Sequence, residues 1–499
     1  MYSTIQELVN KSFEKNKNKL AIEVDSRTLR YDDVNRITDA IAINFFKSEK
    51  PFSRIALIFE NQANYIFAII AILKARCVFV PIDKKYPKKR INHILNNTGI
   101  DMVLFDFNQH EKNMNLKPPK NIKGYYCDYK DYLNSNNSYR INYNYNINDP
   151  IYLYFTSGTT STPKAILGKN ISLTHFIEWE IGLIQNNRCR VAQITSPSFD
   201  PYLRDVFVPL CLGGTICIPK NNNYLINIGS LVRWIEKKKI SLIHCTPTLF
   251  NAFVSSPSFC FIESLEYVFL AGEKTSINTL SKWFELYSDN AQIINLYGPT
   301  ETTLAKMFHV ICKQDIEFGE IPLGKPINDT EILILKPDGT ECEPNEKGEI
   351  AIVTPYVSHG YENNKQLNST IFIMNKKGYL YKTGDIGVKN NKGLVFYRGR
   401  LDRQVKIAGI RIELDEVENI ILKYIGITQC KVIIDDFKNH LIAYYSGQKV
   451  ENIIELQEFV REHIFDIAVP KEFVYLDKVS VNINGKNILD MVYKENIDD

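Results

Sequence analysis

A chain of 499 residues is longer than one hydrophobic core usually organises, so we expect two or three domains. Apolar residues make up 44% of the chain and charged residues 23%, which is typical of a globular protein. The 60 Lys and Arg residues against 57 Asp and Glu residues give a formal charge of +3. This balance excludes nucleic-acid binding through a general basic field and favours small-molecule substrates.

The cysteines and the apolar segments indicate where the chain resides. Its ten cysteines include no C-x-x-C pair, so neither a zinc site nor a disulfide framework is expected, and a reducing cytoplasm fits best. The N-terminus lacks the apolar region of a signal peptide. The longest uninterrupted apolar stretch, Tyr65 to Leu73, is about half the span that a bilayer requires. We predict a buried helix there and no membrane partner.

The first three hundred residues alternate apolar, β-branched segments with amphipathic ones, which predicts an α/β fold with largely parallel sheets. The segment from Tyr125 to Asn148 is crowded with Tyr and Asn and has no period, so it is predicted to be a loop. The expected strands are Arg54 to Phe59, Met102 to Phe105, Arg190 to Thr195, Thr215 to Pro219, Leu242 to Cys245, Tyr267 to Ala271 and Gln292 to Leu296.

After Phe318 the pattern changes to short strands with turn signals, which predicts a β-rich subdomain over about 319–400. Its expected strands are Glu331 to Leu335 and Glu349 to Val353, with a turn at 337–339. From Arg403 the sequence predicts a compact α+β unit, with helices over Asp415 to Ile425 and Ile453 to Ile464 and a strand over Lys431 to Ile434. A domain boundary near Asp402 follows.

The segment Tyr154 to Lys164 reads Y-F-T-S-G-T-T-S-T-P-K and holds six small hydroxyl residues, one glycine and one lysine. Backbone N–H groups, hydroxyls and the charge of Lys164 can together wrap a polyphosphate. A Walker P-loop is a poor match, because Pro163 precedes the lysine and no hydroxyl residue follows it. A polar surface loop remains the alternative.

A second cluster, Asn295-Leu296-Tyr297-Gly298-Pro299-Thr300-Glu301-Thr302-Thr303, follows directly on a predicted strand. Open α/β sheets bind ligands at such carboxyl ends. Tyr297 offers an aromatic face for a base, and Glu301 offers a hard oxygen ligand for Mg²⁺. The alternative is a turn and a helix that Thr300 caps, with Thr303 facing solvent.

Three further clusters follow. Tyr381-Lys382-Thr383-Gly384-Asp385 places a carboxylate after a tight turn, where it can accept hydrogen bonds from both ribose hydroxyls, although such a segment alone is more often a surface turn. The fourth runs from Gly399 to Lys406 and continues through Gly409 to Glu413. The fifth, Asn484-Gly485-Lys486, by itself indicates a hairpin tip.

These five clusters, in this order, resemble the adenylate-forming superfamily, and most closely the adenylation domains of nonribosomal peptide synthetases. Upstream, Leu73-Lys74-Ala75, Val80-Pro81-Ile82-Asp83 and Tyr86-Pro87 resemble an early core motif of that family. The resemblance covers essentially the whole chain. It implies a large N-terminal domain, 1–400, of two mainly parallel sheets with helices plus a small β-barrel. A small mobile α+β domain, 403–499, would follow a hinge at Asp402.

The resemblance assigns a role to each nucleotide-binding position. The ATP phosphates would be held by Thr156, Ser157, Gly158, Thr159, Thr160 and Lys164. Tyr297 would stack on adenine and Glu301 would coordinate Mg²⁺. Asp385 and Arg400 would bind ribose, and Gly272, Asn295, Gly298 and Thr300 would complete the site. Lys486 would stabilise the charge that develops between carboxylate and α-phosphate, so the catalytic residues are expected to be Lys486, Thr156 and Glu301.

The implied reaction is carboxylate plus ATP giving acyl-AMP and pyrophosphate, followed by transfer of the acyl group to a thiol with rotation about the hinge. Several residues depart from the family pattern. Ser161 and Ala165 stand where the phosphate loop normally has glycine, Ala408 replaces an arginine, and Asp415 replaces a glycine. The Asp-Arg that usually follows the lysine motif is absent. A Cβ at 161 or 165 would restrict the loop if these positions need a positive φ.

The segment Ser198 to Asp205 matches the family's substrate-selecting helix. Asp200 stands where amino-acid-activating members hold the substrate's ammonium group, and Phe199 stands where acyl-CoA synthetases more often have histidine. Two structural alternatives stay open: Asp200 caps the helix with Pro201 at its first position, or it pairs with Arg204. The other implied pocket residues are Arg204, His244, Phe269, Ala271, Leu296, Leu304 and Ala305.

Arginine in a mostly apolar pocket indicates a second carboxylate on the substrate. The Asp-Pro, Arg and His combination is similar to that of aminoadipate-activating domains, so an acidic amino acid is the expected substrate. The chain ends soon after Lys486, so we expect a freestanding enzyme that loads a separate carrier protein through its phosphopantetheine arm. The alternatives are an acyl- or aryl-CoA ligase and a nucleotide-binding module that has lost catalysis.

Overall fold

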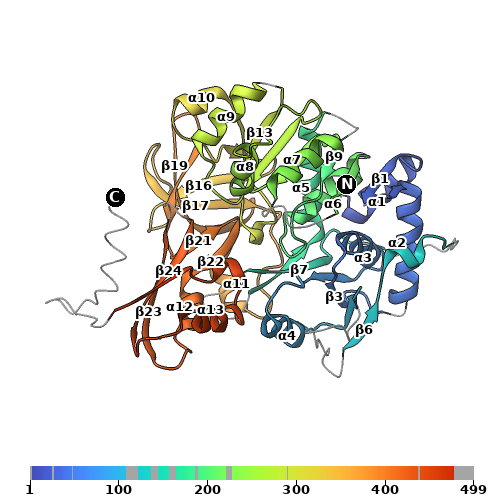
Figure 1. Cartoon of the computed structure of the whole chain (residues 1–499). Helices are drawn as coiled ribbons and strands as arrows, with labels where there is room; N and C mark the ends of the chain where they lie inside the picture. Colours follow the sequence, from blue (N-terminus) through green and yellow to red (C-terminus); the bar gives the residue numbers. More distant parts are fainter. Residues whose placement is uncertain are drawn as a thin grey trace. The chain divides into compact units, whose positions relative to one another are not determined.

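The computed structural model describes residues 3–24, 27–47, 49–107, 122–135, 144–156, 164–185, 189–220, 227–288, 290–435 and 439–476. The chain divides into two compact units, coloured along the sequence in Figure 1. The larger unit comprises residues 1–84, 98–155 and 165–401, and the smaller unit comprises residues 85–97, 156–164 and 402–499.

A nine-stranded sheet, counted over the described residues, forms the centre of the larger unit. Six adjacent strands of this sheet are parallel to one another, and antiparallel pairings extend it at both edges. In spatial order the strands are β15 (Lys325–Pro326), β14 (Met307–Ile311), β13 (Gln292–Tyr297), β12 (Tyr267–Ala271), β11 (Leu242–Cys245), β9 (Arg190–Ala192), β10 (Thr215–Ile218), β1 (Leu20–Val24) and β2 (Arg27–Arg30).

Both faces of this sheet are covered, because successive residues of its buried strands alternate between two cores. Leu242, Phe269 and Ile294 face one core. Ile243 and Val268 face the other. The first core is packed by α1 (Ile5–Lys15), α2 (Tyr31–Phe46), α3 (Gln62–Lys74), α5 (Asn170–Leu183) and α6 (Tyr202–Leu212), and the second by α7 (Ile228–Lys237), α8 (Pro247–Val254), α9 (Ile277–Tyr287) and the short α10 (Lys313–Glu317).

A second sheet of the larger unit has six strands within the described ranges. Their order is β6 (Lys123–Tyr126), β5 (Met102–Phe105), β3 (Arg54–Ile58), β4 (Val78–Pro81), β7 (Pro150–Thr156) and β8 (Lys164–Lys169). Helix α3 is buried from Ala63 to Lys74, because it packs in the core that both sheets share. The apolar stretch Tyr65 to Leu73 is therefore the buried helix that the sequence predicts.

The β-rich part of the larger unit is an antiparallel sheet of five strands among the described residues, with its own small core. The strands are β16 (Glu331–Leu335), β17 (Lys347–Thr354), β18 (Phe372–Asn375), β19 (Gly378–Lys389) and β20 (Val395–Arg400). The helix α11 (Lys365–Ile371) precedes β18, and β20 pairs with β19.

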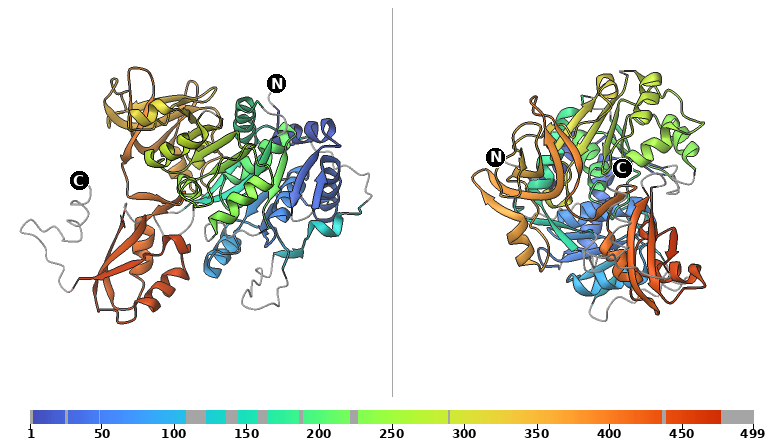
Figure 2. Two further views of the ribbon diagram at one scale, coloured as in Figure 1. Left: turned by 45° about the horizontal axis from the view of Figure 1, so that its top comes forward. Right: turned by 90° about the vertical axis from the view of Figure 1, so that its left-hand side faces the viewer.

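The smaller unit has a separate core. Figure 2 shows its three-stranded sheet, in orange and red, with helices on one face. Its elements after residue 402 are the hairpin β21 (Gln404–Ile407) and β22 (Ile410–Glu413), α12 (Leu414–Ile421), β23 (Ile427–Asp435), β24 (His440–Gly447), α13 (Ile453–Arg461), η3 (Asp466–Ala468) and β25 (Glu472–Tyr475). The helix α4 (Lys88–Asn97) belongs to the same unit.

The structure confirms the α/β class with largely parallel sheets and corrects some local predictions. The segment Tyr125 to Asn148 is not wholly a loop: β6 includes Tyr125, and the short helix η1 (Tyr129–Tyr132) follows, because Tyr129 packs on Phe67 in the core. The helices predicted to reach Ile425 and Ile464 end at Ile421 and Arg461. In the described part of the chain, every helix is too short or too polar to cross a membrane.

Candidate active site

The loop after β13 folds back closely on its own backbone, and Gly298 permits this close approach. A Cβ on Gly298 would lie 2.4 Å from the carbonyl oxygen of Leu304 and 2.6 Å from the Cα of Ala305. Only glycine allows so close an approach of two backbones. Thr303 and Leu304 both adopt positive φ values, 65° and 60°. Such strain persists only where the surroundings enforce it, and it is concentrated at functional sites.

This loop differs from the capped helix that was the structural alternative. Residues Thr300–Thr302 form a single 3₁₀ turn, η2, whose N-cap position is Pro299 rather than Thr300. Thr303 is fully buried and accepts a hydrogen bond from the Tyr152 hydroxyl at 3.3 Å, so it does not face solvent.

Three of the predicted nucleotide-binding residues meet at the end of β13. The Tyr297 hydroxyl donates to Oδ2 of Asp385 at 2.5 Å, and the Arg400 guanidinium pairs with Oδ1 of the same carboxylate. Asp385 and Arg400 lie opposite each other on β19 and β20. Burial, reinforced by the Asp385 charge, raises the pKa of Tyr297 well above its usual range. Tyr297 therefore stays protonated and acts as the donor.

Asp385 is not in the tight surface turn that the sequence indicated. It lies within the twelve-residue strand β19, is 8% exposed, and follows Gly384, whose φ is 73°. The pairing of β19 with β17 is irregular here: Ile386 lies opposite Glu349 and Lys382 opposite Ala351, so the extra residues 383–385, including Asp385, are in β19.

Glu301 is fully buried. The Tyr361 hydroxyl donates a hydrogen bond to Oε1 of Glu301, and Ser358 N–H donates to the Glu301 carbonyl oxygen at 2.9 Å. Sequence reasoning missed Tyr361, because it lies sixty positions away in a segment without a motif. A single carboxylate beside substrate phosphates is an ordinary Mg²⁺ site, and Glu301 stays the predicted ligand for that ion.

Asn295 and Gly272 lie at the carboxyl ends of β13 and β12. The Asn295 Nδ2 donates to the Pro322 carbonyl oxygen at 2.8 Å, which fixes the loop before β15. Gly272 follows β12 with a φ of 100°, a conformation that favours glycine.

The predicted substrate residues share one face of the nine-stranded sheet. His244 of β11 lies beside Phe269 of β12, and Ala271 of β12 lies beside Leu296 of β13. Leu304 and Ala305 pack in the same core. The structure therefore brings these residues together at the carboxyl ends of adjacent parallel strands, where such sheets hold ligands.

The two structural alternatives for Asp200 do not describe the start of α6. The N-cap position is Pro201, where no side-chain capping hydrogen bond forms. Arg204 pairs with Glu180 of α5 instead of Asp200, with Nε 2.8 Å from Oε2 and Nη2 3.1 Å from Oε1. Glu180 was not predicted from sequence. The only signal for it is a glutamate flanked by the apolar residues Trp179 and Ile181.

Most of the predicted phosphate loop lies outside the described residues, including Ser157, Gly158, Thr159, Thr160 and Ser161. Lys486 also lies outside them. The two ends of the loop are described. Thr156 ends β7, and its hydroxyl donates to the Lys164 carbonyl oxygen at 3.5 Å. Ala165 lies in the strand β8 without a positive φ, so its Cβ causes no backbone strain there.

Two other departures from the family pattern lie in the smaller unit. Ala408 and Gly409 form the turn between β21 and β22, and both have a positive φ. Asp415 binds Nη1 of Arg403 at 2.6 Å, next to Glu418. The carboxylate at position 415 therefore joins an ion-pair network, which a glycine could not do.

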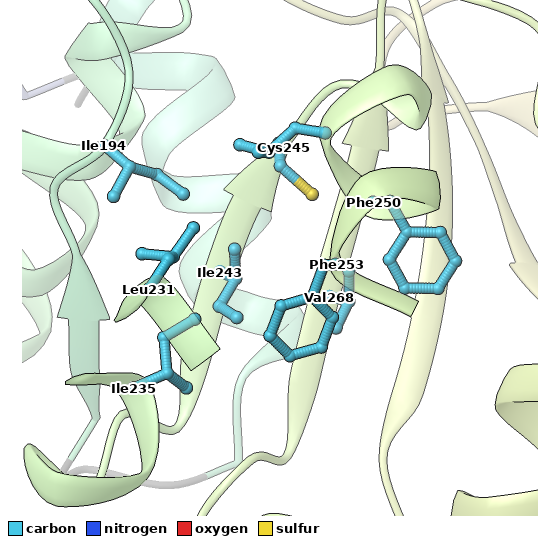
Figure 3. A pocket seen from close by; sticks show the side chains of 9 residues that line it. Ile194, Leu231, Ile235, Ile243, Cys245, Phe250, Phe253 and Val268 are labelled. Carbon is cyan, nitrogen blue, oxygen red and sulfur yellow. The ribbon is translucent and has the colours of Figure 1, made fainter. Parts of the chain in front are cut away.

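An apolar cavity lies on the opposite face of the nine-stranded sheet from His244 and Phe269. Figure 3 shows its lining, which includes Ile243, Cys245 and Val268. Its volume of about 10 Å³ is near the minimum for one water molecule. It does not belong to the candidate site.

Comparison with known proteins places the chain in a family. A model of the AMP-binding enzyme family matches residues 9–362. Gramicidin S synthase 1 of Brevibacillus brevis is 29% identical over 495 residues, which is 97% of this chain but 44% of that protein. The chain thus spans less than half the length of this relative.

Solved structures share the fold. The structure titled holo-PA1221, an NRPS protein containing adenylation and PCP domains, has a TM-score of 0.86 at 21% identity over 99% of this chain and 84% of that one. The o-succinylbenzoate CoA synthetase MenE of Bacillus subtilis has a TM-score of 0.83 at 19% identity, over 99% of both chains. Because the family model covers well over half of the sequence, the chain belongs to the family of AMP-binding, adenylate-forming enzymes.

Proposed function

We propose that this enzyme activates the carboxylate of an amino acid as aminoacyl-AMP, with release of pyrophosphate. It then passes the aminoacyl group to the phosphopantetheine thiol of a separate carrier protein. The PCP domain of holo-PA1221 supports a carrier as acceptor, whereas MenE supports CoA as the alternative.

The observation that supports the proposal is that the end of β13 adjoins both the predicted ribose-binding residues and the predicted substrate pocket. Tyr297 donates to Asp385, which pairs with Arg400, and these two residues are the predicted ribose-binding pair. The preceding residue, Leu296, lies beside Ala271 and shares one core with the other apolar residues of the predicted pocket, Phe269, Leu304 and Ala305. One strand end thus adjoins both residue sets, as a reaction between a carboxylate and a nucleotide phosphate requires.

The proposed chemistry needs no protein nucleophile. A substrate carboxylate oxygen attacks the α-phosphorus of ATP, a new P–O bond forms, and the bond to the bridging oxygen breaks so that pyrophosphate leaves. The thiol then attacks the acyl carbonyl, its proton passes to solvent, and AMP leaves. Mg²⁺, held by Glu301, would neutralise phosphate charge when bound. Lys486 is proposed to stabilise the charge that develops at the α-phosphate.

Asp200 is proposed to bind the substrate's ammonium group, which favours an amino acid over a fatty or aryl acid. The resemblance to aminoadipate-activating domains favours an acidic side chain. Against this stands the bidentate pairing of Arg204 with Glu180, which already engages the guanidinium that would recognise a second carboxylate.

The proposal is tested by ATP–pyrophosphate exchange with each common amino acid and with aminoadipate. One amino acid should support exchange, and Lys486→Ala should remove most of it while ATP affinity persists, because the lysine acts on the transition state. Lys494→Ala, eight residues further along, serves as the control and should keep the wild-type rate.

Exchange that continues unchanged in Lys486→Ala would contradict the assigned role of this lysine. Absence of exchange with every amino acid would refute amino-acid activation, and a panel of aryl and fatty acids would then test the CoA-ligase alternative. Supplying CoA or a holo carrier protein to the preformed adenylate identifies the acceptor.

A further inference from the structure

Four ionisable side chains, two of which are the predicted pocket residues Arg204 and His244, are buried together. Glu180 comes from α5, Arg204 and Asp205 from α6, and His244 from β11. Their side chains are 0%, 3%, 0% and 1% exposed, respectively. Ionised groups buried to this extent are stable only when they are paired.

Each group of this quartet has a partner within it. Arg204 makes the bidentate contact with Glu180, and His244 lies between the two carboxylates. Its Nε2 is 2.6 Å from Oε1 of Glu180, and its Nδ1 is 2.7 Å from Oδ1 of Asp205. The other oxygen of Asp205 accepts from the backbone N–H groups of Ile194 and Thr195.

The quartet joins two basic side chains to two acidic ones. Burial alone would raise the pKa of Glu180, but Arg204 and His244 outweigh this and lower it to about 2. Each ring nitrogen of His244 faces a carboxylate oxygen, and a nitrogen donates to such an oxygen only when it carries a proton. The two basic groups of the quartet are therefore already engaged by its two acidic groups.

The quartet adjoins the predicted pocket. The Arg204 guanidinium carbon lies 5.2 Å from the centre of the Phe269 ring, and the His244 ring centre lies 5.5 Å from it. Phe269, Ala271, Leu296, Leu304 and Ala305 are apolar. A side chain entering this cluster therefore meets apolar groups and a balanced set of charges.

We propose that Glu180 is a specificity-determining residue that neutralises Arg204 and His244, so that the enzyme selects an amino acid with an uncharged side chain. A substrate carboxylate would add an unbalanced negative charge beside Glu180 and Asp205, which a buried site disfavours. This inference rests on the proposed function, amino-acid activation, and replaces an acidic substrate with an uncharged one.

The first test needs only the wild-type protein. It compares amino acids with uncharged and with acidic side chains in ATP–pyrophosphate exchange. Glutamine, leucine and methionine represent uncharged side chains, and glutamate and aminoadipate represent acidic ones. We expect the best uncharged amino acid to exceed both acidic ones by about tenfold or more in kcat/KM. Highest activity with an acidic amino acid would overturn the inference and leave amino-acid activation standing. Absence of exchange with every amino acid would instead refute the proposed function.

The second test changes Glu180. In Glu180→Gln the shape is kept and the negative charge is lost, so Arg204 becomes available to a substrate carboxylate. The ratio of acidic to uncharged activity should rise about tenfold or more. Glu178→Gln, two residues earlier on the exposed side of α5, is the matched control and should leave the ratio unchanged. A folded Glu180→Gln protein with the wild-type ratio would contradict the inference.

A double variant covers the case in which Glu180→Gln fails to fold, which thermal melting would reveal. Glu180→Leu with Arg204→Leu removes the ion pair as a unit, and such replacements of buried pairs are often tolerated. Because Arg204 does not bind substrate under this inference, the preference for uncharged side chains should persist. Selective loss of activity toward acidic amino acids would show that Arg204 recognises a substrate carboxylate. That result would overturn the inference.

Discussion

Lys306 is a fully buried lysine just beyond the strained loop that follows β13. Its Nζ lies 3.5 Å from the Thr303 carbonyl oxygen. Burial lowers its pKa from 10.5 to about 7, because the charged form loses its hydration. Between these two values the unfolded chain binds a proton that the folded chain does not, so the contribution of Lys306 makes stability rise with pH.

We therefore expect Lys306→Met to be stabilised relative to wild type at pH 7, and this advantage to shrink as pH rises toward 9.5. The free energy of unfolding of wild type should gain up to about 1.4 kcal/mol per pH unit over the variant in this window. Urea unfolding at pH 7, 8 and 9 measures the difference. Lys325→Met, at an exposed lysine, is the control, and its free energy of unfolding should change with pH as that of wild type does. If Lys306→Met also showed the wild-type dependence on pH, the lowered pKa of Lys306 would be ruled out.

The sequence motifs predicted which residues lie at the candidate site. They did not predict which side chains these residues contact. The aromatic Tyr297 and the carboxylate Asp385 were singled out from their own motifs. That they contact each other depends on β19 lying beside the end of β13, which neither motif encodes. The same holds for Tyr361, whose hydroxyl donates to Glu301 from a segment with no recognisable motif.

At the scale of elements, the hairpin β21–β22 shows how a departure from the family pattern affects local structure. Ile407 pairs with Ile410, so the loop has two residues, Ala408 and Gly409, with φ values of 48° and 78°. Two positive φ values in a two-residue loop favour Asn-Gly, and alanine at the first position is strained by its Cβ.

Ala408→Asn should therefore raise the free energy of unfolding of the smaller unit by about 1 kcal/mol, because asparagine tolerates the left-handed conformation. Ala408→Val should lower it, since a β-branched residue is more strained at positive φ. Denaturant unfolding of both variants checks the sign. Equal stability of the two variants would show that this turn is not left-handed in solution.

Apolar, β-branched runs predicted most buried strands to within one or two residues, as at β11 and β12, because interior parallel strands are apolar on both faces. The segment 123–132 was harder to predict. Lys123–Tyr126 is an exposed strand and Tyr129–Tyr132 a single turn, so neither has a buried period to recognise. Tertiary packing of Tyr129 on Phe67 decides their conformation.

At the scale of the whole molecule, each compact unit has its own hydrophobic core. Leu456 and Val417 are fully buried in the core of the smaller unit, and Leu231 is buried in a core of the larger one. Separate cores allow units of one chain to unfold in separate transitions.

Leu456→Ala should lower only the transition of the smaller unit, by about 2–5 kcal/mol, because it leaves a cavity in that core. Leu231→Ala is the matched control and should lower only the transition of the larger unit. Differential scanning calorimetry distinguishes the two transitions. A shift of both transitions by either variant would show that the units unfold as one cooperative body.

The sequence by itself determined the α/β class and the order of the motifs, and it predicted the residue types of the nucleotide site, because these depend on local composition and on spacing along the chain. It also indicated a hinge at Asp402, which stays a prediction. Only the tertiary structure decided that Arg204 faces Glu180, 24 positions away, and that His244 faces Glu180 across 64 positions. A buried charge takes its partner from whichever helix packs on the same face of the sheet, and sequence spacing does not encode that packing. Arg204, which the sequence suggested as a ligand for a substrate carboxylate, is thereby bound to a carboxylate of the protein itself.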